Sequence, residues 1–453
     1  MDFASIKKAV IIVASSLFIF FFIHKILQYD TFATEHIIKN YENTDGNRTK
    51  IHKPYEKLTD ENMLHWDAVH YNIISKEGYN ADVVFLFAFF PLFPLLWKLT
   101  MLSPLGISIL NYILFSFSVI LLCRQLKMMK NIWIVLFIVN LPFITPFIIP
   151  YTEALFFFSI TIAFLGFLKG NYWIYFIGAF FTAMTRSAIT IVLLSLLATE
   201  LLFLLKNKRT MQSVNRIFYS ALPLIIGTLA VLIYQKISGA ESLFTYVDAI
   251  KTWDRKLNIS GGLRDWSHEG FGLSIATIFF VVPFSIYTVI EYIKSVFILK
   301  SKNCIVNDKE QKEQYLLLLS AVYTIGMFLT NILFQGGSIN GLYRYILCTP
   351  FFFFQLFFMI NKVRPINTNS KSIFYIFALF AGIFTMSMSG YSASWGFSDL
   401  GFILLALSIG ILLFHQQTKK KSGFIFPVAL FIFNVFWNTY LFNMYVCNGW
   451  IFT

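Results

Sequence analysis

The chain has 453 residues, of which 57% are hydrophobic and 13% are charged, and its mean hydropathy is +0.68. Soluble domains carry about 25% charged residues, so this composition excludes an ordinary soluble protein and favours an all-α polytopic membrane protein. The formal net charge of +13 does not indicate a nucleic-acid partner, because the basic residues lie in short clusters between apolar runs, as in cytoplasmic loops.

The first apolar run follows Lys7 and Lys8 and continues to Ile26. It contains no clear small-x-small cleavage site, so we expect a retained signal anchor whose N-terminal side faces the cytoplasm. The polar stretch 29–83, in which acidic residues outnumber basic ones, then forms a large outer loop.

Residues 84–102 are apolar enough to span the membrane, but Pro91 and Pro94 favour a broken helix over a straight one. If this segment spans, the basic loop at 124–130 moves to the outer side and later basic loops follow it. We therefore interpret 84–102 as a re-entrant or interfacial segment. The alternative is that it does span and that another apolar segment does not.

The apolar runs predict about 13 transmembrane helices in a single integral membrane domain, 1–453, because a lone span in lipid must satisfy its own backbone hydrogen bonds. The expected spans are 8–28, 104–123, 132–149, 153–169, 172–187, 188–205, 217–238, 271–299, 315–334, 342–361, 372–390, 398–414 and 423–446. This topology places the basic clusters inside, a second outer loop at 239–270 and the C-terminal end outside.

Ionisable residues from separate regions then converge on the outer face. Asp67 lies in the first outer loop, and Glu153 opens a helix there; Arg186 lies at an outer turn, and Arg344 lies just inside another outer end. The loop 239–270 adds Asp248, Trp253, Asp254, Arg255, Asp265 and Trp266. Because ionisable groups at membrane depth are costly and mark functional sites, we interpret this convergence as an outward-facing active cavity.

Each of these residues also has a simpler interpretation. Asp67 would be a solvated loop acid, and Glu153 a helix-start acid favoured by the helix dipole. Arg186 would extend to the interface, and Arg344 would bind phospholipid head groups. The joint arrangement distinguishes the cavity from these alternatives better than any single residue does.

Residues 65–71, His-Trp-Asp-Ala-Val-His-Tyr, are followed by Gly78-Tyr79 and by Ala-Phe-Phe-Pro-Leu-Phe-Pro at 88–94. This order resembles the first-loop signature of the PIG-V/Gpi18 family of mannosyltransferases, a Trp-Asp-Ala-x-His core, a Gly-Tyr and then Ala-Phe-Phe-Pro-x-x-Pro. Three later segments resemble the family's Tyr-Ser/Thr-Glu, Arg-Ser/Thr and Arg-Tyr elements: 150–156, 185–187, and 343–345 with Pro350. The order agrees from about residue 8 to the end of the chain.

The resemblance implies a GT-C fold and an enzyme that moves a sugar, most often mannose, from a polyprenyl-phosphate donor on the non-cytoplasmic face. Eukaryotic members add the second mannose to the glycosylphosphatidylinositol precursor, which makes a GPI mannosyltransferase 2 in the endoplasmic reticulum membrane one alternative. Residues 244–255 look more like the prokaryotic relatives, which lack that pathway, and this implies the plasma membrane. The acceptor, a lipid or a glycan, therefore stays open.

Sugar transfer from a lipid phosphate needs a base for the acceptor hydroxyl and positive charge for the departing phosphate. Our hypothesis makes Asp67 the general base of a single, inverting displacement. Arg186 and Arg344 are candidates to bind the donor phosphate, because one guanidinium can bond two oxygens at once. A divalent cation bridging Asp67 and the phosphate is compatible with this chemistry, although the sequence has no DxD motif that requires one.

Three further residues are candidates to bind substrate. His70, one helical turn after Asp67, would contact sugar or phosphate, and Trp66 would stack on a sugar ring or the prenyl chain. Glu153 would bind sugar hydroxyls or hold an arginine. The segment 84–102 would line the groove for the lipid tail, or else it simply fills space.

A transporter or flippase of lipid-linked sugars is the main alternative class, and a non-catalytic scaffold for another glycosyltransferase is a third. Transporters often contain inverted repeats with broken helices in matching halves, and no such repeat is visible in this sequence. The large acidic first loop also favours an enzyme.

Overall fold

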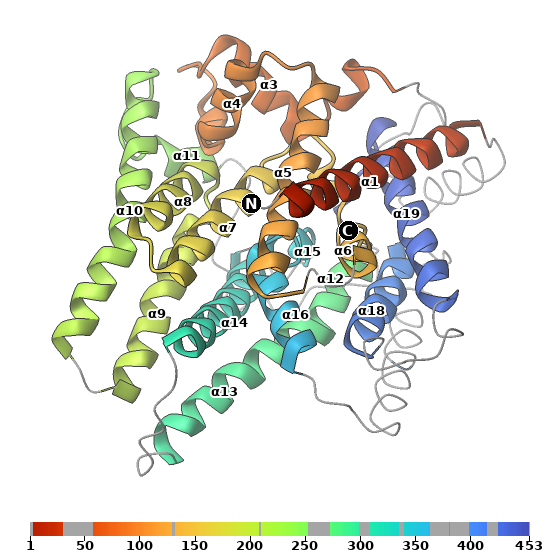
Figure 1. Ribbon diagram of the computed structural model, residues 1–453. Coiled ribbons are helices and arrows are strands. Elements are labelled where there is room, and N and C mark those ends of the chain that lie inside the picture. The colour runs from red at the N-terminus through yellow and green to blue at the C-terminus, as the bar shows by residue number, and fades with distance from the viewer. Residues whose placement is uncertain are drawn as a thin grey trace.

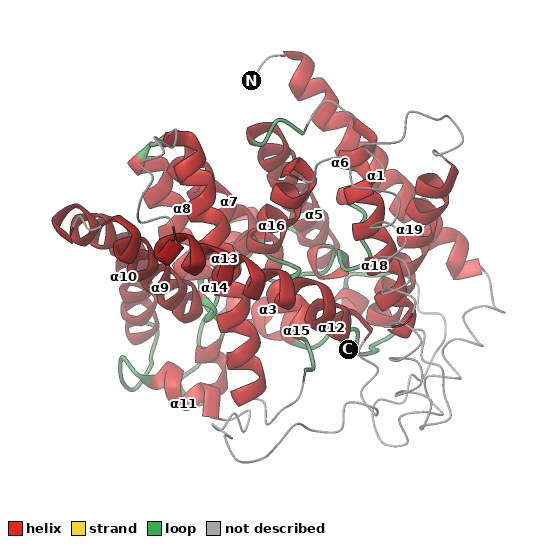
Figure 2. Ribbon diagram, turned by 90° about the horizontal axis from the view of Figure 1, so that it is seen from below, coloured by secondary structure: helices red, strands yellow, loops and turns green. Residues whose placement is uncertain are grey.

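The computed structural model describes residues 3–29, 58–128, 132–207, 210–251, 272–298, 308–334, 339–362, 380, 398–414 and 425–452. Within these ranges every regular element is a helix (Figure 2). In chain order they are α1 (Phe3–Tyr29), η1 (Glu61–Met63), α3 (Asp67–Glu77), η2 (Val84–Ala88), α4 (Leu92–Thr100), α5 (Pro104–Gln125), α6 (Ile132–Ile138), η3 (Thr145–Phe147), α7 (Glu153–Lys169), α8 (Tyr172–Thr185), α9 (Ile189–Asn207), α10 (Thr210–Ile237), α11 (Thr245–Lys251), α12 (Gly272–Ala276), η5 (Thr277–Val281), α13 (Val282–Ile298), α14 (Asp308–Phe334), α15 (Leu342–Ile346), α16 (Pro350–Lys362), α18 (Ser398–Phe414) and α19 (Ile425–Val446).

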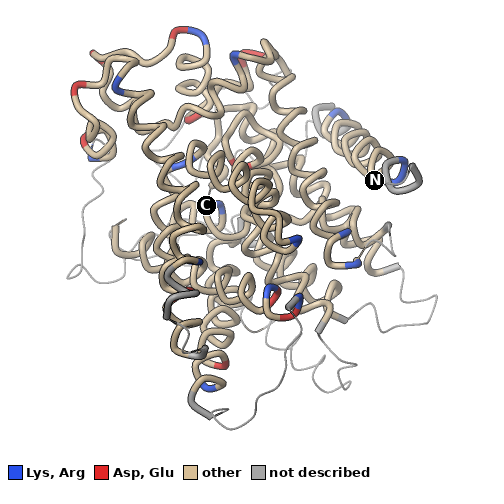
Figure 3. The backbone as a smooth tube through the Cα atoms, turned by 60° about the vertical axis from the view of Figure 1, so that its left-hand side comes forward, with Lys and Arg blue, Asp and Glu red and all other residues tan. Residues whose placement is uncertain are grey.

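Five of the described helices are long and apolar enough, by length and composition, to cross a membrane. They are Lys7–Lys25, Pro104–Gln125, Asn215–Ile237, Gly272–Val296 and Lys309–Phe334. Most of the described chain carries no charged residue, as the tan tube in Figure 3 shows. These helices indicate a multi-pass membrane protein, in agreement with the composition.

The segment 84–102 is broken, as its prolines predict. It forms the short η2 and the nine-residue α4, and Pro91 stands immediately before α4. A nine-residue α-helix is about 14 Å long, which is less than half of the hydrocarbon core. A straight span at 84–102 is therefore excluded, and its position at a membrane interface stays a prediction. The next helix, α5, begins at Pro104, where the Ser103 side chain caps the Gly106 amide.

Two predicted spans do not form single helices. The run 132–149 contains α6, which ends at Ile138, and then η3, because Pro142 and Pro146 interrupt the helical hydrogen bonds. The run 342–361 divides into α15 and α16 at Pro350, since a proline disfavours helical backbone at the residue before it. The predicted span 372–390 lies outside the described residues except for position 380.

The helices α7 and α8 form a tight antiparallel hairpin (Figure 1). A Cβ atom added at Gly166 would lie 2.2 Å from the Tyr175 backbone nitrogen, and one added at Gly178 would lie 2.3 Å from that of Ala163. Small residues let helix backbones approach this closely in membrane proteins. Because the hairpin is antiparallel, the start of α7 and the end of α8 lie at the same end of the pair.

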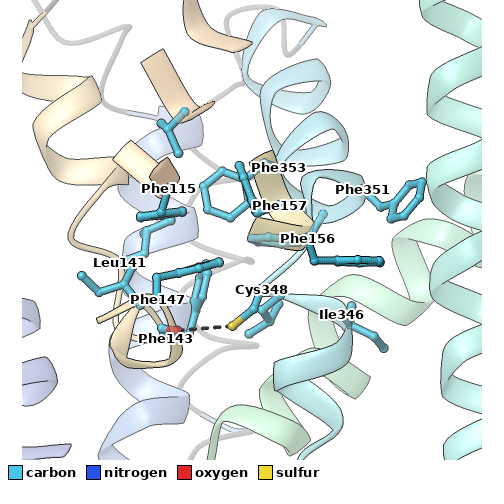
Figure 4. Close-up of a cluster of buried hydrophobic side chains, with 14 of the residues drawn as sticks. Phe115, Leu141, Phe143, Phe147, Phe156, Phe157, Ile346, Cys348, Phe351 and Phe353 are labelled. Atoms are coloured by element: carbon cyan, nitrogen blue, oxygen red, sulfur yellow. Dashed lines mark hydrogen bonds between the residues drawn. The ribbon is translucent and has the colours of Figure 1, made fainter. Parts of the chain in front are cut away.

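An aromatic core joins the helices that lead to this end. Phe115 of α5 stacks on Phe147 of η3 with ring centroids 3.9 Å apart, and Phe157 of α7 meets Phe353 of α16 edge to face at 4.9 Å (Figure 4). The Cys348 thiol, between α15 and α16, donates to the Phe143 carbonyl at 3.5 Å. This core fixes α7 relative to α16 and to the link that joins α16 to α15.

Candidate functional site

Asp67 is the first residue of α3 and follows an unusual turn. Trp66 has φ 53° and ψ −127°, a conformation that a bulky side chain rarely adopts and that costs about 1–3 kcal/mol. The amides of Ala68 and Val69 bond back to the carbonyls of His65 and Trp66. The turn therefore places the Asp67 carboxylate at the N-terminus of α3, where the helix dipole favours negative charge.

Asp67 is one end of a connected group of four charged residues. Its Oδ2 atom accepts a hydrogen bond of 3.0 Å from Nη2 of Arg344, whose Nε donates to Oε1 of Glu153. Nη1 of Arg186 lies 2.9 Å from the same Glu153 oxygen. The structure thus brings together Asp67, Glu153, Arg186 and Arg344, which we call the charge cluster and which come from four separate chain regions.

Burial differs sharply along the charge cluster. The Glu153 side chain is 0% exposed, and the side chains of Arg344 and Arg186 are 8% and 10% exposed. Asp67 is 35% exposed and is therefore the open end of the cluster. Two carboxylates face two guanidinium groups, so the cluster has no net formal charge when all four groups are ionised.

Aromatic rings enclose both guanidinium groups. The central carbon of Arg344 lies 4.7 Å from the Tyr151 ring centroid and 4.6 Å from that of Phe452. Arg186 lies 5.1 Å from the ring of Tyr345. A desolvated cation over an aromatic ring gains about 2 kcal/mol, so the rings contribute to holding the arginines in place. Neither Tyr151 nor Phe452 was a predicted site residue, although Tyr151 belongs to the segment 150–156 that resembles the family's Tyr-Ser/Thr-Glu element.

His70 and Trp66 border the open end of the charge cluster without joining its hydrogen bonds in the described part of the chain. His70 lies one turn after Asp67 on α3, as predicted, and its ring centroid is 5.0 Å from those of Phe85 and Phe89. Burial lowers the pKa of His70 below its usual 6.5, although the nearby Asp67 opposes this shift. His70 is therefore mainly neutral at pH 7.

The broken segment 84–102 forms the wall beside His70. Phe89 contacts the ring of Tyr71 on α3 at 5.1 Å, and its carbonyl accepts a 2.5 Å hydrogen bond from the Tyr79 hydroxyl. Phe85 and Phe89 come from η2 and the turn after it. The wall is apolar and aromatic, which suits an apolar chain, but its role as a lipid groove stays a prediction.

The second predicted outer loop, 239–270, contributes little to the site as far as it is described. Asp248 on α11 pairs with Lys251 at 2.7 Å, and both side chains are exposed. Trp253, Asp254, Arg255, Asp265 and Trp266 lie outside the described residues. Among the described residues, no group of three or more His, Cys, Asp or Glu side chains is arranged to hold a metal ion.

The charge cluster combines a partly exposed carboxylate with a buried ionic support. Such a carboxylate can accept a proton or bind a hydroxyl group, and the support keeps it in one orientation. Comparisons of the chain with protein-family models, with curated proteins and with solved structures gave no match. The function is therefore inferred from the geometry of the charge cluster and from the sequence around Asp67.

Proposed function

We propose that the protein is a membrane glycosyltransferase that moves a hexose, with mannose as the expected sugar, from a polyprenyl-phosphate donor to a lipid or glycan hydroxyl on the non-cytoplasmic face. The observation that carries this proposal is the 3.0 Å bond from buried Arg344 to the partly exposed carboxylate of Asp67. The resemblance of residues 65–71 to a mannosyltransferase first-loop signature supports the same assignment.

In the proposed reaction Asp67 accepts the proton of the acceptor hydroxyl. The hydroxyl oxygen forms a bond to the anomeric carbon of the sugar while the bond from that carbon to the phosphate oxygen breaks. The polyprenyl phosphate leaves with the bonding electron pair, and Asp67 returns its proton to solvent. One displacement of this kind inverts the anomeric centre.

The geometry refines the roles of the two arginines. Arg344 uses Nε for Glu153 and Nη2 for Asp67, so in this proposal its first role is to fix the Asp67 carboxylate. The donor phosphate adds negative charge to a cluster whose formal charges already cancel. We assign the phosphate contact to guanidinium nitrogens that the carboxylates do not use, with Arg186 as the main candidate.

The groups beside Asp67 supply the remaining contacts in this proposal. Trp66 and His70 face the sugar or the first units of the prenyl chain, and Phe85 and Phe89 extend the apolar surface behind His70. Glu153 is fully buried and bonds both arginines, so we assign it the holding role and not the binding of sugar hydroxyls.

The test incubates membranes containing the protein with labelled polyprenyl-phosphate mannose and follows the label into acceptor lipids or glycans. Wild-type membranes should transfer label, and Asp67→Asn should reduce the rate by about 10²–10⁴-fold, the usual contribution of a positioned base. Asp82→Asn, an exposed acid of the same loop, is the matched control and should transfer normally. Label that crosses the bilayer still attached to its donor would instead identify a flippase.

A further inference from the structure

The chain after α19 turns back toward the charge cluster. Asn448 adopts the left-handed conformation, with φ 65°, and the amide of Gly449 bonds to the Met444 carbonyl at 2.7 Å. Asparagine tolerates this conformation better than most residues, so it suits a turn at a helix C-terminus. The turn directs Trp450, Ile451 and Phe452, which we call the return segment, away from the axis of α19.

The end of α19 and the return segment bind the turn that carries Asp67. The Tyr445 hydroxyl lies 3.0 Å from the Met63 carbonyl and 3.2 Å from that of His65. The ring of Trp450 meets that of Trp66 edge to face, with centroids 5.0 Å apart. Trp66 is the residue with the strained backbone, and such strain persists only where surrounding contacts hold it.

The return segment also binds the turn that carries Arg344. The amide of Gly341 donates to the Phe452 carbonyl at 2.7 Å, and the Tyr343 hydroxyl donates to the Ile451 carbonyl at 2.9 Å. Nε1 of Trp450 donates to the Asn340 side chain at 3.2 Å. The segment is therefore hydrogen-bonded to the residues on both sides of the start of α15.

Phe452 completes the enclosure of Arg344. Phe452 is 1% exposed, and its ring centroid lies 4.6 Å from the central guanidinium carbon. Its ring also stacks on that of Tyr151, with centroids 5.4 Å apart. Trp450 packs against Phe452 at 5.1 Å. The rings of Trp66, Trp450, Phe452 and Tyr151 thus form a continuous row, and the Arg344 guanidinium lies against both of the last two.

We propose that the return segment is part of the active site, in which Phe452 positions Arg344 and Trp450 positions the Trp66 turn, so that together they orient the Asp67 carboxylate. This inference rests on the proposed sugar transfer and adds positioning residues to it. Neither side chain is assigned a contact with the reacting atoms. Without the Phe452 ring, water reaches one face of the guanidinium and the arginine gains rotational freedom, so the bond to Asp67 is held less firmly.

The kinetic test compares Phe452→Leu with Phe452→Tyr, which keeps an aromatic ring, and with Phe442→Leu as the matched control. Phe442 lies on α19 and is 0% exposed. Its ring packs on Phe20 of α1 and not on the residues that surround Arg344. Using labelled polyprenyl-phosphate mannose, we expect Phe452→Leu to lower kcat by about tenfold with little change in the KM for donor. Phe452→Tyr should restore most of the rate, and Phe442→Leu should keep the wild-type kcat.

Equal kcat values for Phe452→Leu and Phe442→Leu, or a loss that Phe452→Tyr does not restore, would overturn the inference. A second measurement does not depend on activity. The Tm shifts of Phe452→Leu and Arg344→Lys should be non-additive in the double variant, because both remove the same contact, whereas Phe442→Leu and Arg344→Lys should add. If the Tm shifts of Phe452→Leu and Arg344→Lys add in the double variant, the positioning role of Phe452 is refuted. If these shifts are non-additive but the wild-type protein transfers no sugar, only the proposed reaction is refuted.

Discussion

Asp67 differs from the exposed acids around it in its partner and not in its own chemistry. Arg344 reaches it from a short helix more than 270 positions later in the chain, and Glu153 fixes that arginine from the buried side. Within the charge cluster, only the Asp67 end is substantially exposed to solvent. At the scale of single residues, the site is therefore one partly exposed carboxylate with a buried ionic and aromatic support.

Glu153→Gln should show how much the support contributes. The substitution removes the negative charge between Arg186 and Arg344 and leaves two buried guanidinium groups close together. Breaking a buried ion pair costs about 3–5 kcal/mol, so we expect a clear fall in Tm in detergent. Exposed Glu291→Gln, on α13, is the control and should leave Tm nearly unchanged. Equal Tm values for the two variants would show that the buried pairs contribute nothing to stability.

His70 should make stability depend on pH. Burial lowers its pKa in the folded protein, with Asp67 opposing the shift, so the unfolded chain binds a proton at higher pH than the folded one. The stabilisation is present above the ordinary pKa of 6.5 and is lost as pH falls through the lower folded value. Between about pH 7.5 and about pH 5, His70→Gln should lose less Tm than the wild type. Parallel Tm curves for the two proteins would show that His70 does not contribute.

Sequence could predict which charged residues meet, but not how they pair. Ionisable groups near membrane depth are rare and costly, so Asp67, Glu153, Arg186 and Arg344 were visible as candidates. Which arginine reaches Asp67 depends on side-chain geometry within a packed core, and sequence does not encode that locally. Phe452 carried no signal at all, since it is one of 54 phenylalanines.

At the scale of elements, the α7–α8 hairpin determines whether Glu153 and Arg186 meet. Glu153 begins α7, and Arg186 follows the last residue of α8. Hydropathy predicted both helices within two residues of their observed bounds. It failed where prolines interrupt an apolar run, at Pro142, Pro146 and Pro350, because composition is insensitive to a missing amide donor.

Gly178→Ala should separate the two helices of the hairpin. The added methyl group would lie 2.3 Å from a backbone nitrogen of α7, which cannot move without shifting the helix. We expect destabilisation of about 1–3 kcal/mol, together with slower transfer as Arg186 moves from Glu153. Gly326→Ala is the matched control, because its nearest neighbour is a side-chain atom at 3.4 Å. It should be neutral or slightly stabilising, and the same loss of Tm in both variants would contradict the close-packing argument.

At the scale of the whole molecule, the proposal requires that the open end of the charge cluster face the non-cytoplasmic side. The five long apolar helices indicate a multi-pass membrane protein, and the distribution of basic residues predicts its orientation. Length and composition were sufficient for the class because lipid imposes helices on every span. They were insufficient for the number of spans, since short and broken helices occur between the long ones.

Cysteine labelling should establish the orientation. In a Cys304→Ser background, Asp82→Cys and Lys127→Cys place thiols at exposed positions on opposite sides of the predicted topology. A membrane-impermeant maleimide should label intact cells or sealed vesicles of known orientation at position 82 from the outer side, and at position 127 only after permeabilisation. If both thiols are labelled from the same side, the chain between positions 82 and 127 does not cross the membrane once as predicted, and the predicted topology is wrong.

The most direct test of the central claim measures single-turnover transfer and Tm together for Asp67→Asn. Asparagine has the shape of aspartate and can still accept a hydrogen bond from Arg344, so the ionic support loses only its exposed end. The proposed role of Asp67 predicts that transfer from labelled polyprenyl-phosphate mannose is lost while Tm stays close to that of the wild type. Transfer at the wild-type rate in a folded Asp67→Asn protein would contradict it.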